Sequence, residues 1–210
     1  GIFILKLKKE IEKGLPGEIS HVKMAPINRP LTSTSLKTQK IVRESAVAII
    51  LYPKNGGIEC LLTQRTEYDG SHSGQISFPG GKKEIDDEHL DHTARRESYE
   101  EIGIPINNGI LISQLTQVYI PVSGFLVQPF IYFHAEIPTL TPNEREVAEI
   151  ISFSVEELLA EECFSTMSVQ FSTGIIQKNI PCFNLAKKQV WGATALIINE
   201  LRELLLRVNK

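Results

Sequence analysis

The sequence is poor in the residues that build disulfide frameworks and cysteine-based metal sites. Its three cysteines, Cys60, Cys163 and Cys182, are odd in number and widely spaced, without a closely spaced pair of the kind that binds zinc. We therefore expect reduced thiols in or near the core. The chain also lacks an apolar run of the roughly 20 residues needed to cross a bilayer and a charged-then-apolar leader. These absences predict a cytoplasmic protein with no membrane partner.

The sequence also has no strong excess of positively or negatively charged residues. The chain has 22 Lys and Arg residues against 25 Asp and Glu residues, a formal net charge of −3. This balance gives no overall attraction to nucleic acid or acidic lipid, so we expect a small-molecule ligand and no nucleic-acid partner. An anionic ligand would need a local group of basic side chains. The candidates for this group are Arg65, Lys82, Lys83, Lys187 and Lys188.

The composition is that of a folded globular protein. Charged residues make up 22% and hydrophobic residues 42% of the 210 residues, enough to bury one sizeable core. Residues 3–13 have the apolar spacing of a short amphipathic helix, and residues 25–39 read as an extended connection. We predict that residues 1–40 form this helix and connection, packed on a single domain of residues 41–210.

The middle of the chain is dominated by predicted strands. Residues 46–52 and 59–65 are β-rich and flank Pro53-Lys-Asn-Gly-Gly57, a strong hairpin-turn signal. Residues 193–208 have the pattern of an amphipathic helix that packs on a sheet. The other predicted elements are strands at 110–119, 126–134 and 149–153, a short helix at 155–163 and a hairpin at 175–183. This order predicts an α/β fold with a mixed β-sheet between helices.

Three glutamates, Glu97, Glu100 and Glu101, have the spacing that places them on one face of a helix. Carboxylates stacked in this way repel one another unless a cation lies between them. Ligands that offer only oxygen suit Mg²⁺ or Mn²⁺, which leave coordination positions for water and phosphate. A solvated acidic helix is the alternative interpretation.

The residues around this helix argue for a built site. Asp91 or Thr93 can cap its start, and Gly103 can end it in the left-handed conformation. Upstream, Phe78-Pro79-Gly80-Gly81 predicts a tight loop whose backbone can approach a phosphate or direct a carbonyl group at a metal. The small or apolar residues that can pack the helix on a core are Ala94, Ser98 and Ile102.

These features resemble the signature of the Nudix hydrolases: Gly, five residues, Glu, seven residues, then Arg-Glu-hydrophobic-x-Glu-Glu-x-Gly-hydrophobic. Residues 96–104 match its second half, except that Ser98 stands where a hydrophobic residue is usual. The first half of the signature fits only if one extra residue is allowed. Counting back from Arg96 places Glu88 at the family's glutamate position, but it places Lys82, rather than Gly81, at the family's glycine position. Such an insertion resembles the coenzyme A pyrophosphatase subgroup.

The same subgroup carries an upstream signature, and the chain resembles that as well. It has Leu61-Leu62-Thr63-Gln64-Arg65, then Gly74, then Phe78-Pro79-Gly80-Gly81, at the subgroup's spacing. Thr66 stands where Ser or Ala is usual, and Gly70 stands where Arg is usual, which removes a cation near a polyanionic substrate. Further similar segments are 43–48, 123–129, 146–149 and 191–195, so the resemblance extends over roughly residues 43 to 205.

The resemblance implies a Nudix α/β/α sandwich and hydrolysis of a pyrophosphate bond with Mg²⁺ or Mn²⁺. We assign Glu97, Glu100 and Glu101 as metal ligands, with the Gly81 carbonyl group as an additional ligand. Arg96 lies four residues before Glu100 and is expected to orient the carboxylates rather than to touch substrate.

A general base must also take a proton from the attacking water. Nudix enzymes draw it either from the acidic helix or from a distant loop, so Glu100 and Glu146 are the contenders here, and Glu144 and Glu149 are alternatives. For Glu146, a solvated charge in an acidic run is an equal interpretation.

Substrate contacts are expected on both sides of the acidic helix. Arg65 either binds substrate or braces the glycine loop, His72 either contacts phosphate or is an ordinary loop histidine, and Phe125 either lines a pocket or belongs to the core. The complete set of predicted substrate-binding residues is Arg65, His72, Gly80, Lys82, Ser123, Gly124 and Phe125.

Three functions are compatible with these patterns. The resemblance implies cleavage of coenzyme A or acyl-CoA to 4′-phosphopantetheine, or its acyl form, and adenosine 3′,5′-bisphosphate. The second is a Nudix hydrolase for another nucleoside diphosphate derivative, such as a dinucleotide, ADP-ribose or NADH. The third is a non-catalytic nucleotide-binding module, against which the three intact helix glutamates argue. The sequence does not decide whether the chain forms a homodimer.

Overall fold

A mixed eight-stranded sheet is the centre of the fold in the computed structural model, which describes residues 1–39, 42–66, 74–171 and 174–209. Its strands are β1 (Arg43–Lys54), β2 (Gly57–Arg65), β3 (Ile76–Ser77), β4 (Gly80–Lys82), β5 (Ile110–Gln114), β6 (Val118–Ile120), β7 (Phe125–Phe133) and β8 (Val147–Ser154). The main path is β3-β2-β1-β7-β5, and β4, β8 and β6 pair with β1, β2 and β7. Strands β1 and β7 are parallel, and the other pairs are antiparallel.

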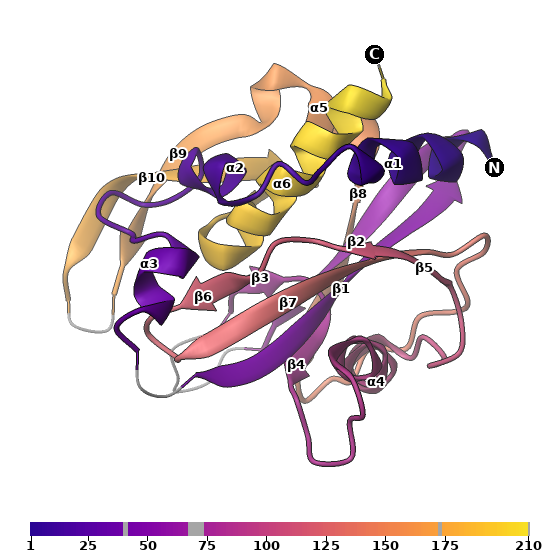
Figure 1. Ribbon diagram of the computed structural model, residues 1–210, viewed down its shortest axis with the longest axis horizontal. Coiled ribbons are helices and arrows are strands. Elements are labelled where there is room, and N and C mark those ends of the chain that lie inside the picture. Colours follow the sequence, from indigo (N-terminus) through magenta and orange to yellow (C-terminus); the bar gives the residue numbers. More distant parts are fainter. Residues whose placement is uncertain (40–41, 67–73, 172–173, 210) are drawn as a thin grey trace.

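Helices cover both faces of this sheet (Figure 1). Helix α4 (Leu90–Ile102) lies on one face, and α1 (Ile2–Glu12), α2 (Glu18–Val22) and α6 (Gly192–Val208) lie on the other. Alternate side chains of β1 separate the two cores, because successive residues of a strand point to opposite faces. Ala48 and Ile50 pack with α4, whereas Ile49 and Leu51 pack with α6. The predicted α/β/α sandwich is therefore confirmed.

A smaller three-stranded sheet flanks the main one. It consists of β9 (Phe164–Gln170), β10 (Ile176–Leu185) and β11 (Lys188–Val190), in the order β11-β10-β9. The prediction of a hairpin at residues 175–183 was wrong, because this segment lies in the single strand β10, which pairs with β9 on one side and β11 on the other. Strand β9 was not predicted, because its polar residues obscure the strand pattern.

The turn between β1 and β2 confirms the predicted hairpin. Lys54 pairs with Gly57, so the loop consists of Asn55 and Gly56 alone. Both have positive φ, 51° and 81°. A two-residue loop with both residues in this region matches the twist of the flanking strands, and Asn-Gly is the sequence that tolerates it best.

Three other element predictions are corrected. Residues 110–119 form two strands, because the Thr116 backbone N–H donates to the Glu200 carboxylate (3.1 Å) and leaves the ladder. The segment 155–163 is divided between α5 (Val155–Leu159) and a 3₁₀ helix (Glu161–Cys163), because Ala160 is extended. The segment predicted to be an extended connection contains α3 (Thr32–Leu36).

The buried Glu200 carboxylate joins the N-terminal segment to α6 and to the β5–β6 connection. It accepts hydrogen bonds from the Gly17 backbone N–H (3.1 Å) and the Thr116 hydroxyl group (2.7 Å), and it faces His21 Nε2 at 3.1 Å. These partners hold the pKa of Glu200 below its usual value although burial acts in the opposite direction. The predicted domain boundary at residues 40–41 lies outside the described residues.

The three cysteines are buried and free, as expected. None of the helices in the described part of the chain is both long enough and apolar enough to cross a membrane.

Replacing Glu200 by Ala should lower the free energy of unfolding by about 3 kcal/mol or more, because it leaves buried donors without a partner. Urea denaturation followed by circular dichroism measures this change. The matched control is Glu203→Ala, which removes an exposed ion pair with Lys23 (2.7 Å) and should cost less than about 1 kcal/mol. Equal losses in the two variants would contradict the assigned role.

Candidate active site

Helix α4 carries the acidic face and packs on the sheet with its opposite face. Ala94, Ser98 and Ile102 are buried, as predicted, and the Ser98 hydroxyl group donates to the Ala94 carbonyl oxygen (2.7 Å), which satisfies a polar group where a hydrophobic one is usual. Gly103 ends the helix with φ 78°, the predicted left-handed conformation. The predicted caps were wrong, because the helix begins earlier than expected and His89 is the N-cap residue.

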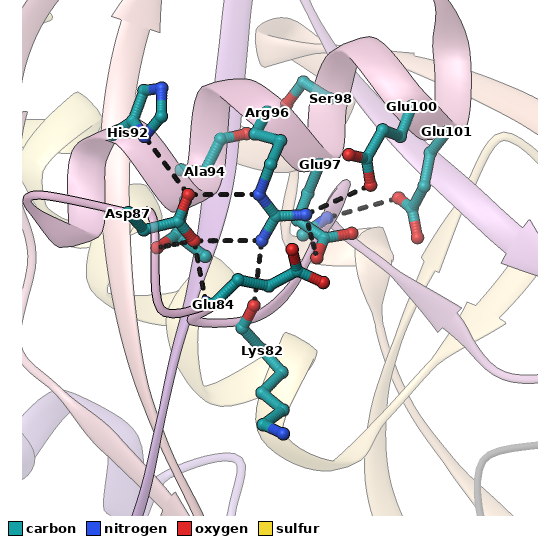
Figure 2. A network of polar contacts seen from close by, with 12 residues as sticks. Lys82, Glu84, Asp87, His92, Ala94, Arg96, Glu97, Ser98, Glu100 and Glu101 are labelled. Atoms are coloured by element: carbon teal, nitrogen blue, oxygen red, sulfur yellow. Dashed lines mark hydrogen bonds and ion pairs between the residues drawn. The ribbon is translucent and has the colours of Figure 1, made fainter.

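Arg96 is the hub of the polar network in Figure 2. Its Nε and Nη2 atoms donate to the two carboxylate oxygens of Asp87 (3.1 and 3.0 Å), and Nη2 also donates to the Lys82 carbonyl oxygen (2.9 Å). Its Nη1 atom donates to Glu97 (3.0 Å) and to Glu100 (3.1 Å). The planar guanidinium group thus fixes two of the predicted metal ligands to the strand that carries Lys82.

Asp87 is buried beneath this arginine. It also accepts hydrogen bonds from the Glu84 backbone N–H and the Thr93 hydroxyl group, both at 2.9 Å. Burial acts to raise the pKa of Asp87, but the hydrogen bonds, those from Arg96 first, hold it well below the usual value. Its charge is therefore retained in a buried position because every donor around it favours the ionised form.

Asp87 was not among the site residues predicted from the sequence. Counting across the inserted residue assigned the family's glutamate position to Glu88, but Glu88 is exposed and it is Asp87 that contacts Arg96. Adjacent acidic residues cannot be told apart by counting when the loop before them varies in length. A sequence signal for Asp87 was Thr93, whose hydroxyl group donates to it in the structure. A single threonine is too common to identify a buried aspartate by itself.

Glu101 is the most enclosed of the three helix glutamates. One oxygen accepts a hydrogen bond from the Gly80 backbone N–H (3.2 Å), and the other lies 3.8 Å from Arg65 Nη1. Burial raises the pKa of Glu101 to about 8, although Arg65 and Gly80 act to lower it. This carboxyl group lacks the charge compensation that Asp87 has, and a nearby cation would favour its ionised form.

Both glycines of the Phe-Pro-Gly-Gly segment make close contacts. A Cβ atom on Gly81 would lie 2.4 Å from the Glu97 carboxyl group, and one on Gly80 would lie 2.3 Å from the Ala46 carbonyl oxygen. The predicted tight loop is in part a strand, since Gly80–Lys82 pairs with β1. The glycines therefore allow β4 to pair closely with β1 while it contacts Glu97 of α4.

Glu97 and Glu100 differ in environment. Burial raises the pKa of Glu97, Arg96 lowers it, and Glu100 and Glu146 raise it further. The Glu100 side chain is 48% exposed, with its carboxylate on Arg96 Nη1. The pair thus offers one sheltered and one accessible carboxylate on the same helix.

Glu146 comes to the site from a distant part of the sequence. The loop before β8 is tied to the end of α4, because the Asn143 backbone N–H donates to the Glu101 carbonyl oxygen (2.8 Å) and the Asn143 side chain donates to Glu146 (3.2 Å). The charge of Glu146 raises the pKa values of both Glu97 and Glu101. The structure therefore brings these acidic groups together, whereas Glu149 is bound to Lys188 (2.6 Å).

Within the described ranges, no three His, Cys, Asp or Glu side chains converge tightly enough to form a preformed metal site. Arg96 engages Glu97 and Glu100, while Glu101 turns toward Gly80 and Arg65. The donor set nevertheless fits Mg²⁺ or Mn²⁺, because it consists of carboxylate oxygens, and burial together with repulsion from neighbouring carboxylates raises the pKa values of Glu97 and Glu101. A cation would relieve this repulsion.

The predicted substrate residues fall into two groups. Arg65, Gly80 and Lys82 lie against α4 and its arginine. Ser123 and Gly124 form the β6–β7 turn, which Phe125 follows on β7 beside Arg43 of β1. His72 and Gly70 lie outside the described residues. Both described groups are at the N-terminal end of β1, which pairs with β4 and β7 there.

This sandwich, with a carboxylate-rich helix against a Gly-Gly strand, defines an α/β/α protein with an acidic site. The particular family follows from comparison, since the NUDIX domain model matches residues 42–168. The chain is 34% identical over 142 residues to an uncharacterized Nudix hydrolase, NudL, of Pectobacterium atrosepticum, covering 67% of this chain and 72% of that protein. The corresponding protein of Yersinia enterocolitica is 32% identical, covering 68% and 72%. The chain belongs to the Nudix hydrolases and is a pyrophosphohydrolase.

Solved structures agree on the fold. A Nudix hydrolase of M. smegmatis, RenU, aligns with a TM-score of 0.55 at 18% identity, covering 78% of this chain and 86% of that chain. The MutT protein of Methanosarcina mazei aligns with a TM-score of 0.52 at 21% identity, covering 82% and 98%.

Replacing Asp87 by Asn should lower activity at least tenfold and cost about 3 kcal/mol of stability, because it breaks a buried charge pair. The charge of Asp87 contributes its full stabilisation above about pH 4, the usual pKa of an aspartate. This contribution is lost as the pH falls through the lowered pKa of Asp87 in the folded protein, so the variant should lose less stability on acidification than the wild type. Urea denaturation at several pH values and a turnover assay measure both effects.

Glu88→Gln is the control for this experiment. Because Glu88 is exposed, the change should leave stability within about 0.5 kcal/mol and activity within twofold. A larger effect of Glu88→Gln than of Asp87→Asn would reverse the assignment.

Proposed function

We propose that this enzyme cleaves the pyrophosphate bond of coenzyme A or its acyl derivatives, giving 4′-phosphopantetheine, or its acyl form, and adenosine 3′,5′-bisphosphate. The observation that carries the proposal is that the two sequence signatures meet at Glu101. Arg65, from the upstream signature that resembles coenzyme A pyrophosphatases, faces this carboxylate, and the Gly80 backbone N–H donates to it. The segment that marks the subgroup therefore contacts the acidic helix.

The residues that would hold Mg²⁺ or Mn²⁺ are Glu97, Glu100 and Glu101, with the Gly81 carbonyl group as a further ligand. Such an ion would supply positive charge to neutralise the diphosphate oxygens and to polarise the attacking water. Arg96 keeps Glu97 and Glu100 on the side of β4, and Asp87 keeps Arg96 in place. Arg65 supplies positive charge for the diphosphate beside Glu101, and Lys82 supplies it from the opposite face of β4.

The attacking water must lose a proton to a carboxylate near the helix. Glu100 and Glu146 are the two contenders, because both are accessible and the loop that carries Glu146 is anchored to the end of α4. Glu144 is exposed and remains an alternative, and Glu149 is less suited because Lys188 binds it.

A substrate panel tests the proposal. With Mg²⁺ or Mn²⁺ added separately, we expect kcat/KM for coenzyme A or an acyl-CoA to exceed that for NADH, ADP-ribose and diadenosine compounds at least tenfold, with adenosine 3′,5′-bisphosphate as product by chromatography. The opposite ranking would favour another nucleoside diphosphate derivative, a drift that Gly70 in place of the usual Arg would explain. Binding without turnover would indicate a non-catalytic module.

Replacing Glu100 by Gln should reduce kcat at least 100-fold, the scale of a lost catalytic group, without unfolding the protein. The side chain is half exposed, so stability should change by about 0.5 kcal/mol or less. Turnover and urea denaturation measure the two effects, and Glu88→Gln, at an exposed position outside the site, serves as the acidic control. Undiminished turnover in Glu100→Gln would refute its role, and a large loss in Glu146→Gln alone would identify Glu146 as the base.

A further inference from the structure

Arg43, at the start of β1, has a fixed and exposed guanidinium group. It lies 4.3 Å over the ring centroid of Phe125 and donates a hydrogen bond to the Ser123 carbonyl oxygen. Among the residues that the structure describes, no carboxylate forms an ion pair with it; its neighbour Glu44 is bound instead to Lys83 at 3.3 Å. Arg43 is therefore held in place by a ring and a carbonyl group, neither of which neutralises its charge.

The strand register places this charge on one face with Lys82. Arg43 pairs with Phe125, and Ser45 pairs with Lys82. Cross-strand partners share a face, as do residues two apart on a strand. Lys82 and Arg43 thus share a face, with their backbones about 7 Å apart along β1.

Gly81 and Lys82, as successive residues of β4, face opposite sides of the sheet. Gly81 contacts the Glu97 carboxyl group, whereas Figure 2 shows the Lys82 side chain pointing away from the Arg96 network while its carbonyl oxygen faces that network. A substrate whose diphosphate lies at β4 can therefore extend from the acidic helix onto the face that carries Lys82 and Arg43.

We propose that Arg43 binds a phosphate monoester on the nucleoside half of the substrate, separate from the diphosphate that is cleaved. This inference rests on the proposed function. The step of about 7 Å from Lys82 to Arg43 along β1 is comparable to the separation of the phosphorus atoms carried by the 5′ and 3′ oxygens of one ribose, and the guanidinium fork suits a phosphate group. Arg43 would then distinguish 3′-phosphorylated substrates, such as coenzyme A, from nucleotide derivatives that lack this group.

The test compares kcat/KM for coenzyme A with that for dephospho-coenzyme A, which differs only in the 3′-phosphate. The wild type should prefer coenzyme A at least tenfold. Arg43→Met keeps an apolar stem over Phe125 but removes the charge, and it should abolish this preference by raising KM for coenzyme A while leaving dephospho-coenzyme A within twofold. Arg43→Lys should restore part of the preference.

Lys83→Ala is the matched control, because it also removes a positive charge near β1, but one that Glu44 already compensates. It should leave the ratio of the two substrates within twofold. Equal losses for both substrates in Arg43→Met would show that Arg43 merely braces the β6–β7 turn and would overturn the proposal. An unchanged ratio would overturn it too.

A binding measurement separates this inference from the proposed function. Calorimetry with adenosine 3′,5′-bisphosphate and with AMP needs no turnover. Stronger binding of the bisphosphate to the wild type, lost in Arg43→Met, would support the phosphate site even if coenzyme A proved not to be cleaved. Equal affinities of the wild type for the two nucleotides would overturn the site, whatever the substrate panel shows.

Discussion

The contact between Arg96 and Asp87 is the constraint on which the rest of the site depends. A buried carboxylate is costly unless its oxygens are hydrogen-bonded and its charge is matched. Asp87 meets both conditions because the arginine binds its two oxygens. The remaining donor of the same guanidinium group then reaches Glu97 and Glu100. One planar cation thereby sets the relative positions of the β4–α4 loop, the strand and the acidic face.

Buried acidic groups serve opposite purposes in this protein. The pKa values of Asp87 and Glu200 are lowered by their hydrogen-bond donors although burial acts to raise them, so the charged forms of these groups are favoured and hold elements together. The pKa of Glu101 is raised to about 8 by burial with weaker compensation. Its environment therefore suits an added cation, which neither of the other two groups needs. The difference lies in the number and distance of donors, not in residue type.

Two successive residues of β4 face the two parts of the proposed substrate site. Gly81 admits the Glu97 carboxyl group on one side, and Lys82 points to the other side, where Arg43 and Phe125 lie. In our proposal, bond cleavage belongs to the side of α4 and recognition of the distal phosphate to the opposite side. The pleat of a short strand is sufficient to make this division, because adjacent residues point in opposite directions.

The sequence alone determined the local features: the Asn-Gly hairpin, the glutamate spacing on α4, the glycine that ends it and the family to which the chain belongs. Each depends on residues close together in the chain, whose geometry follows from helix period, turn chemistry or motif. Only the tertiary structure decided that Asp87 rather than Glu88 binds Arg96, that Thr116 leaves its strand for Glu200, and that Glu146 approaches the helix. These outcomes depend on which distant donors and acceptors meet, and pairing across the sheet, rather than local pattern, sets those distances.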